Sequence, residues 1–338
     1  MENKLGDSFA MSKKTQILWI DDNEDRKRRA TNLEDETGMT VEFVSLRQKD
    51  VSSVLDKIRA EQAPSLIIID HVLNNTKSGD WTQQGSTLVG FFRESWVGCP
   101  VLGITAAKNL EEIDTEKYVY DELLDITDFS NYIHCIPNIV KGFKQCSNVK
   151  DINQWINLLK PPKDEKERIS TCIPHEVKTN VNKKGFASRS YRWFSRKFYG
   201  MPGFLYDKDW VATFIGVKRE EVERYLKFFD NAKYNGIFNN PDIPRWWKAK
   251  LYQIVYSKSK DQKDTFCSSQ YLANQVLKVP KKDRSKCFAC GEEWPETVAY
   301  LDESSNATLK QMHLRCTVAH SLYRYEPMFE EVRVMKEN

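Results

Sequence analysis

Three aspartates close two apolar runs near the start of the chain, which makes them candidates for chemistry. Asp21 and Asp22 follow the run 17–20, and Asp70 ends the run 66–70. Continuously apolar runs are typical of parallel strands that are covered on both faces. The carboxyl ends of such strands form the edge of an open α/β sheet where ligands bind. Carboxylates gathered there would hold a hard cation such as Mg²⁺ beside a carboxylate that could accept a transferred group.

Cysteines and a histidine near the C-terminus form a second candidate site. Cys287 and Cys290 make one C-x-x-C hook, and His313 and Cys316 make an H-x-x-C hook. Four soft or borderline ligands at this spacing predict a tetrahedral zinc site, and Gly291 permits the tight turn of the first hook. Four protein ligands leave no open position for catalysis, so the expected zinc ion is structural. The alternative is that these thiols never meet.

The elements that would position these side chains alternate along the first half of the chain. Strand patterns at 16–20, 40–46, 66–70 and 101–104 alternate with helix patterns at 24–36 and 51–61. This alternation predicts an α/β doubly wound parallel sheet. We expect a disordered leader (1–14), the α/β domain (15–146), a helix with a charged linker (147–170), a mainly α basic region (171–260) and a small zinc-bound α+β module (261–338).

Thr105 follows the apolar run 101–104 and completes the acidic pattern. Together with Asp21, Asp22 and Asp70, it resembles the site of a response-regulator receiver domain (CheY-like). The resemblance implies that Asp70 accepts a phosphoryl group from a histidine kinase, a kinase-like protein or a small phosphodonor. It also implies that Asp21, Asp22 and Asp70 hold Mg²⁺, and that Thr105 binds a phosphoryl oxygen and acts as the switch.

Two positions depart from the receiver pattern. The family places a glycine closer behind the acceptor, whereas Gly85 lies fifteen residues after Asp70 and the segment 74–84 resembles an insertion. The family also has a lysine near the end of the last strand, but the stretch 123–127 holds no basic residue. Lys77 or Lys108 would have to replace it. The alternative is a pseudo-receiver that switches by binding a partner.

The segment 208–226 has the spacing of a helix-turn-helix. Ala212 lets two helices approach, Gly216 supplies the turn, and Val222 packs into the same core. The second helix would lie in the major groove of DNA and present basic side chains, namely Lys218, Arg219, Arg224 and Lys227. The acidic residues at 220, 221 and 223 oppose this, because they repel phosphates, and such folds also serve as plain packing units.

Basic residues are interleaved with aromatic ones upstream of that segment. This pattern suits a phosphate backbone with stacking contacts; the alternative is an aromatic core with lysines on its wet face. The basic candidates are Lys183, Lys184, Arg189, Arg192, Arg196 and Lys197, and the aromatic residues are Tyr191, Trp193, Phe194 and Phe198.

The formal net charge of +3 hides an asymmetry, since residues 1–135 carry −9 and residues 136–338 carry +12. A basic second half predicts that double-stranded DNA meets this part of the chain, unless the two halves simply attract each other. No stretch approaches the roughly 18 apolar residues of a membrane span, and 1–14 is unlike a secretory signal. We therefore expect a cytoplasmic protein without a membrane partner.

These features together predict a response-regulator-like signalling protein with phosphorylation-tuned nucleic-acid binding, most simply in transcriptional regulation. A homodimer would fit this function. The alternative is a pseudo-receiver adaptor that docks onto a kinase-like or ATPase partner, as in a stress or phage-defence system. The sequence contains no evident nucleophile–base pair and no open metal site, so we expect no enzymatic activity of the chain's own.

Overall fold

The structure, a computed structural model, describes residues 16–47, 51–59, 62–73, 83–106, 118–258, 269–293, 297–302, 308–313 and 316. The predicted leader 1–14 lies outside these residues. The chain divides into two compact units. Unit 1 is Met1–Ile152 with His175–Arg192, and unit 2 is Asn153–Pro174 with Trp193–Asn338.

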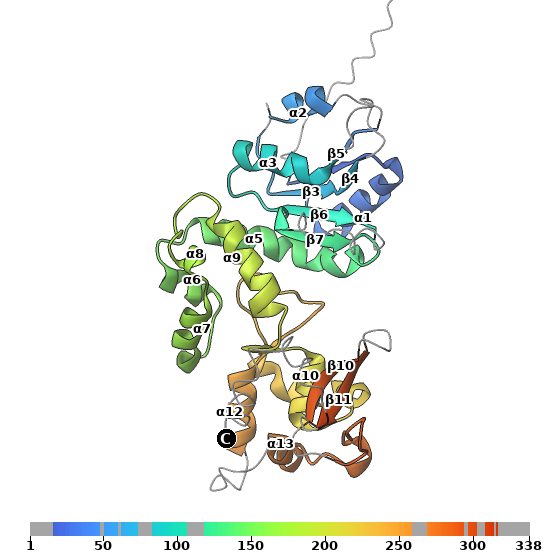
Figure 1. The fold of residues 1–338 in the computed structure, drawn as a ribbon, viewed down its shortest axis with the longest axis vertical. Coiled ribbons are helices and arrows are strands. Elements are labelled where there is room, and N and C mark those ends of the chain that lie inside the picture. The colour runs from blue at the N-terminus through green and yellow to red at the C-terminus, as the bar shows by residue number, and fades with distance from the viewer. Residues whose placement is uncertain are drawn as a thin grey trace, which may run out of the picture. The chain divides into compact units, whose positions relative to one another are not determined.

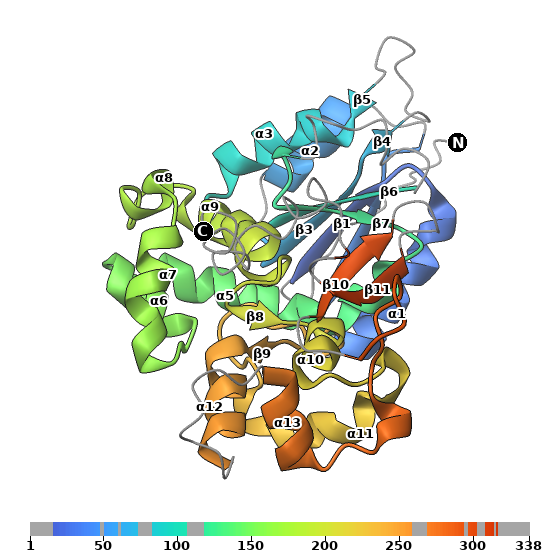
Figure 2. The same cartoon turned by 60° about the horizontal axis from the view of Figure 1, so that its bottom comes forward.

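Unit 1 is built on a five-stranded parallel sheet (Figures 1 and 2). The register pairs Ile20 with Ile69 and Asp70 with Ile104, so β1, β3 and β6 end at one edge of the sheet. The spatial order β2-β1-β3-β6-β7 is the 2-1-3-4-5 order of flavodoxin-like and CheY-like doubly wound sheets. The strands are β1 (Ile17–Asp21), β2 (Val41–Ser45), β3 (Leu66–Asp70), β6 (Val101–Thr105) and β7 (Glu122–Asp125).

Helices cover both faces of this sheet (Figure 1). Successive β1 residues point to opposite faces, so Trp19 packs in one apolar cluster with Leu33, while Ile20 packs in another with Leu88 and Phe92. The predicted doubly wound sheet is therefore confirmed. The first face carries α1 (Lys27–Thr37), the 3-10 helix η3 (Phe129–Cys135) and α5 (Ile136–Ser147), and the second carries α2 (Val51–Arg59) and α3 (Gly85–Ser95).

Smaller elements complete unit 1. The short strand β4 (Val72–Leu73) follows β3 closely and pairs with β5 (Gln83–Gln84), which precedes α3. Two later helices, α8 (His175–Lys178) and α9 (Phe186–Trp193, with Trp193 in unit 2), also belong here. Tyr191 of α9 is buried and donates its hydroxyl to Glu122 Oε2 of β7 at 2.6 Å.

Unit 2 combines short helices with small β elements. It contains α6 (Ile152–Leu158, with Ile152 in unit 1), the π-helix η5 (Phe194–Tyr199), β8 (Leu205–Tyr206), α10 (Lys208–Ile215), α11 (Glu223–Leu226), β9 (Trp246–Trp247), α12 (Lys248–Lys258) and α13 (Ser269–Leu277). An antiparallel hairpin follows, formed by β10 (Thr297–Asp302) and β11 (Thr308–His313). Figure 2 shows α13 beside α10.

The segment expected to be a charged linker is helical. It forms the 3-10 helix η4 (Lys163–Glu165) and α7 (Lys166–Cys172). Ile169 is fully buried, and the buried Glu165 pairs with Arg168, so one face of α7 packs while its charged face meets solvent. The charge density of this segment alone did not reveal its buried face.

The helix-turn-helix segment begins as its pattern predicts. α10 ends at Gly216, whose φ of 70° is left-handed, and Ala212 and Val222 are fully buried. The second helix, however, is irregular: η6 (Arg219–Glu221), the single turn α11 and η7 (Lys227–Ala232) follow one another with helical backbone angles at Val222 and Lys227 and a kink at Phe229. α10 packs on α13, whose Asn274 donates its side-chain amide to Ile215 O at 2.9 Å. The stretch after Lys218 is therefore helical but irregular, and it is not a regular α-helix throughout.

The aromatic residues interleaved with basic ones are core residues. Tyr191, Trp193, Phe194 and Phe198 are all buried, with Trp193 exposed by only 8%. Phe194 and Phe198 pack with Tyr199 and Tyr234 in an aromatic cluster. A stacking platform needs exposed ring faces, so these rings do not form one, and the aromatic-core alternative is correct.

Candidate functional site

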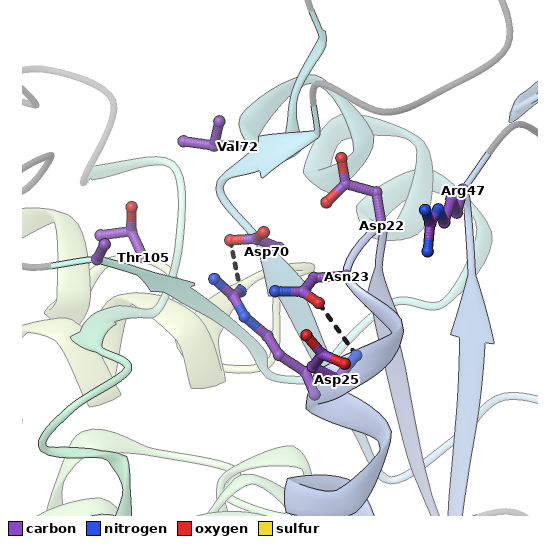
Figure 3. A pocket seen from close by; sticks show the side chains of 9 residues that line it. Asp22, Asn23, Asp25, Arg47, Asp70, Val72 and Thr105 are labelled. Atoms are coloured by element: carbon purple, nitrogen blue, oxygen red, sulfur yellow. Dashed lines mark hydrogen bonds and ion pairs between the residues drawn. The ribbon is translucent and has the colours of Figure 1, made fainter.

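The three aspartates of the sequence pattern gather at the carboxyl edge of the sheet. Carboxylate oxygens of Asp21, Asp22 and Asp70 all lie within 4.8 Å of one another, and all three residues are buried. Asp22, Asp70 and Thr105 face a pocket of about 440 Å³ (Figure 3). The other lining residues are Asn23, Asp25, Arg26, Arg47, Val72 and Ala106.

Asp21 lies behind this pocket, since it is buried and does not line it. Its Oδ1 accepts the Asn23 backbone N–H at 2.8 Å, and its Oδ2 accepts the Trp19 indole N–H at 3.2 Å. Both carboxylate oxygens are therefore engaged within the protein. Asp21 is an anchor of the site, whereas Asp22 and Asp70 offer their oxygens to the pocket.

Arg26 contacts the acidic cluster, and sequence reasoning did not single it out. Its Nη1 lies 2.9 Å from Asp70 Oδ1 and 3.1 Å from Asp21 Oδ2. Arg26 ends the 3-10 helix η1 (Glu24–Arg26), which Asn23 caps by accepting the Asp25 backbone N–H. A signal was present, because a basic residue within one turn of an acidic pair at a strand end can fold back onto it.

Burial and charge set the ionisation of this cluster. Burial, together with the neighbouring Asp21 charge, raises the pKa of Asp70 to about 7, although Arg26 lowers it. Burial also raises the pKa of Asp21. Burial lowers the pKa of Arg26, but the charges of Asp70 and Asp21 outweigh this and raise it overall. The guanidinium therefore stays charged beside carboxyl groups that are costly to ionise.

Gly85 packs directly against the end of β3. A Cβ built on Gly85 would lie 2.1 Å from Asp70 O and 2.8 Å from Ile69 Cγ2, so no other residue fits without displacing this backbone. Its N–H donates to His71 O at 2.7 Å. The close approach of α3 to the end of β3 is thus kept, although Gly85 is farther along the chain than the receiver pattern places it.

Thr105 and the end of the last strand complete the edge. Thr105 is fully buried at the end of β6, one residue after Ile104, the register partner of Asp70. β7 ends at Asp125, which accepts the Thr127 backbone N–H and adds no positive charge. The two lysines proposed as replacements, Lys77 and Lys108, lie outside the described residues.

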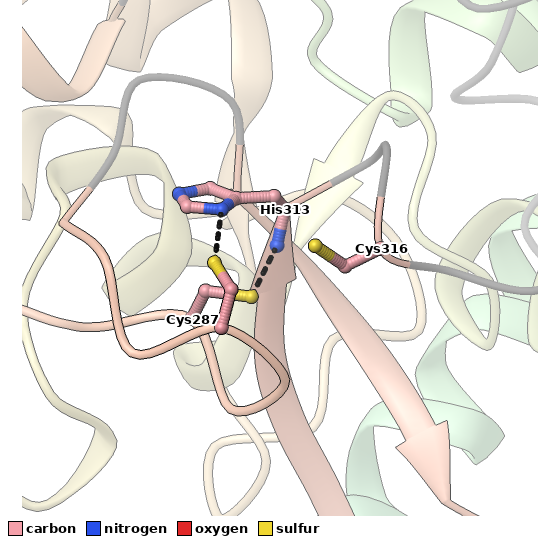
Figure 4. A group of neighbouring side chains, drawn as sticks. Cys287, His313 and Cys316 are labelled. Carbon is pink, nitrogen blue, oxygen red and sulfur yellow. Dashed lines mark hydrogen bonds between the residues drawn. The ribbon is translucent and has the colours of Figure 1, made fainter.

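The cysteine and histidine hooks also come together. Ligand atoms of Cys287, Cys290, His313 and Cys316 lie within 4.8 Å of one another (Figure 4). Cys290 Sγ is 3.2 Å from His313 Nδ1, and Cys287 Sγ accepts the His313 backbone N–H at 3.2 Å. Gly291 has a φ of 75°, and its N–H donates to Cys287 O at 2.8 Å, which closes the expected tight turn.

The surroundings of these hooks suit a metal-binding role. His313 Nε2 lies 3.2 Å from Glu293 O, so a carbonyl can fix the ring and leave Nδ1 facing the thiols. Burial raises the pKa of Cys287, but the backbone N–H groups of His313, Cys290 and Ala289 outweigh it and lower this pKa to about 7. The lowered pKa favours the thiolate of Cys287, and the thiolate is the form of cysteine that binds zinc.

The basic residues predicted to bind nucleic acid are distributed over both units. Lys183, Lys184, Lys197 and Lys218 are exposed. The arginines are more engaged: Arg192 donates to Tyr118 O and Arg189 to Lys184 O. Arg219 pairs with Asp209, and Arg224 pairs with Glu221 and Asp283. Arg196 is half-buried in η5.

Comparisons with known proteins give partial likenesses. No protein-family model matches the chain, and no curated protein matches it. The receiver domain of NtrX from Brucella abortus is 17% identical and covers 37% of this chain and 96% of its own, with a TM-score of 0.30. A two-component response regulator from Clostridium difficile is 19% identical and covers 40% and 99%, with a TM-score of 0.29.

A third likeness is the receiver domain of the Francisella response regulator 1452, at 18% identity, 38% and 96% coverage and a TM-score of 0.27. TM-scores this low do not establish that the proteins share a fold. The receiver-like fold of unit 1 follows instead from its own strand order and register. Among the described helices, none has the length and apolar character needed to cross a membrane.

Proposed function

We propose that this chain is a signalling regulator of the response-regulator type, in which Asp70 accepts a phosphoryl group and thereby tunes nucleic-acid binding. The observation that carries the proposal is the gathering of Asp21, Asp22 and Asp70 at the carboxyl edge of a 2-1-3-4-5 sheet. In this topology the crevice beside the first and third strands is where ligands bind. A histidine kinase or kinase-like protein is the proposed partner.

In the proposed transfer, a carboxylate oxygen of Asp70 attacks the phosphorus of an acyl phosphate. A P–O bond to Asp70 forms while the P–O bond to the acyl group breaks, and the leaving carboxylate keeps the bonding electron pair. No proton needs to move. Asp70 must be ionised to attack, and Arg26 at 2.9 Å favours the ionised form.

The residues of the pocket fit a bound Mg²⁺. Asp22 and Asp70 offer the oxygen ligands that Mg²⁺ prefers, and a bound ion would supply positive charge near the transferred group. Thr105 lines the same pocket, where its hydroxyl would donate to a phosphoryl oxygen. Asp21, held by Trp19 and Asn23, would keep the pocket's floor in place.

The proposed output is binding of double-stranded DNA. Its support is the +12 charge of residues 136–338 together with the exposed lysines, Lys183, Lys184, Lys197 and Lys218. Arg219 and Arg224 are expected to contribute less, because acidic neighbours already pair with them. Transcriptional regulation is the simplest role for such an output.

We further propose that Cys287, Cys290, His313 and Cys316 hold one structural zinc ion. The support is chemical: three thiols and one imidazole stand within tetrahedral reach of a single ion, and four protein ligands leave no open position. The ion would fasten the 287–290 turn to the end of β11 and so stabilise this part of unit 2.

The direct test is incubation of the full chain with an acyl phosphate and Mg²⁺, followed by intact-mass measurement. We expect the mass of one phosphoryl group to be added to the wild-type chain and not to Asp70→Asn. Fluorescence anisotropy with duplex DNA, measured in parallel, should change with the donor only in the wild type. Absence of transfer to the wild type would contradict the proposal. DNA binding that is unchanged by the phosphodonor would contradict the proposed control of DNA binding by phosphorylation.

A further inference from the structure

The acidic pocket of unit 1 needs a positive charge, and the last strand of the sheet supplies none. Phosphorylation would add negative charge to Asp70, which already lies within 4.8 Å of Asp21 and Asp22. Such a buried cluster needs a fixed cation. The residues at 122–127 include no basic side chain. Among the described residues that line the pocket, two are basic, Arg26 and Arg47.

Of these two, Arg26 is built into the site. Its side chain is only 16% exposed, and Nη1 touches Asp70 and Asp21 at 2.9 and 3.1 Å. Arg47, in contrast, is exposed at the turn after β2. Both contacts of Arg26 are made by Nη1. The remaining N–H groups of the guanidinium can therefore donate to the oxygens of a phosphoryl group on Asp70.

We infer that Arg26 is the residue that neutralises the phosphoryl group on Asp70, taking this role from the start of α1 instead of the end of β7. The inference rests on the proposed function. Before transfer, Arg26 balances the buried carboxylates. After transfer, Asp21 still anchors the guanidinium through Oδ2, and the fork donates to the phosphoryl oxygens while the Oδ–P bond persists.

The anchoring network makes this position specific. Asp21 Oδ2 accepts from both the Trp19 indole and Arg26, and Asn23 caps the 3-10 turn that carries Arg26. The guanidinium is thus held before any phosphoryl group arrives. Preorganised charge of this kind needs no rearrangement during transfer, which is the condition under which it lowers a barrier most.

The test compares Arg26→Gln and Arg26→Lys with a matched control, Arg28→Gln, in the full chain. Arg28 is exposed and lies two residues further along the same helical segment. The rate of phosphoryl transfer from an acyl phosphate with Mg²⁺ is measured by intact mass. Binding of beryllium trifluoride, a phosphoryl mimic, is followed by tryptophan fluorescence, because Trp19 contacts Asp21.

We expect Arg26→Gln to slow transfer and weaken beryllium trifluoride binding by about tenfold or more, Arg26→Lys to recover part of both, and Arg28→Gln to match the wild type. If Arg26→Gln does not fold, the lysine variant decides, because loss of the fork should still weaken binding of the mimic several-fold.

Two other outcomes are separable. If the wild type is phosphorylated and Arg26→Gln is phosphorylated at an equal or faster rate, the inference is overturned and the proposed function stands. A faster rate in the variant would mean that Arg26 blocks access to Asp70. A wild-type chain that takes neither the phosphoryl group nor beryllium trifluoride would overturn the proposed function, and the inference with it.

Discussion

At the scale of single residues, the buried carboxyl group of Asp70 is costly to ionise. Its carboxyl group is buried, and its pKa is raised to about 7 by burial and by Asp21. A folded-state pKa above the unfolded value means that stability is fully present at low pH and is lost as pH rises from about 4 through 7. The ionised, reactive form is thus the less stable one.

We therefore predict that Asp70→Asn stabilises the chain more at pH 8 than at pH 5, because the buried charge is fully present only above the folded-state pKa. The gain at pH 8 should exceed the gain at pH 5 by on the order of 2 kcal/mol, because the amide removes the buried charge while Arg26 keeps its contact with Asp21. Thermal melts in EDTA at both pH values measure this. Asp35→Asn, on the exposed side of α1, is the control. A stabilisation that is equal at both pH values would contradict the prediction.

At the scale of elements, the approach of α3 to β3 shapes the surroundings of Asp70. We predict that Gly85→Ala lowers the free energy of unfolding by about 2 kcal/mol or more, since the new methyl would overlap Asp70 O. It should also slow phosphoryl transfer by moving Asp70.

Gly90→Ala, in the same helix with nothing within 4 Å of its Cβ, is the matched control. It should be neutral, or stabilising by up to about 1 kcal/mol. Chemical denaturation of both variants measures the difference. Equal effects from the two alanines would show that helix propensity, and not the contact with Asp70, governs position 85.

The elements also show where sequence reasoning ends. The parallel sheet was predictable because the run 66–69 is apolar throughout, and the acidic edge followed from Asp70 directly after it. The contact of Arg26 was signalled only by its position within one turn of the acidic pair, because that contact depends on how a 3-10 turn folds back over two strand ends. The rings Trp193 and Phe194 were ambiguous, since the same interleaving with basic residues suits a core or an exposed platform.

At the scale of the whole molecule, the proposed zinc ion is a folding element separate from the acidic pocket. Purified protein should contain one zinc ion per chain by elemental analysis, and Cys290→Ser should reduce this content by at least half. Cys172→Ser, at an exposed thiol outside the cluster, is the control. Chelation should lower the melting temperature of unit 2. A wild-type chain purified without zinc that melts unchanged in chelator would contradict the proposal.

The distribution of basic residues predicts which substitutions weaken DNA binding. Replacing both Lys183 and Lys184 by Ala should lower affinity and reduce the slope of log affinity against log salt by about 2, because both side chains are exposed. Arg219→Ala should change the slope little, since Asp209 already pairs with this guanidinium. Anisotropy titrations across a salt series measure both. A larger effect from Arg219→Ala would place the interface on the segment after α10.

The most direct measurement of the central claim is the site of phosphoryl transfer. The full chain is treated with an acyl phosphate and Mg²⁺, reduced with borohydride, which converts an aspartyl phosphate to homoserine, and mapped by peptide mass spectrometry. The account predicts homoserine at position 70 alone, and none without Mg²⁺ or in Asp70→Asn. Modification at another carboxylate, or none in a folded chain, would contradict it.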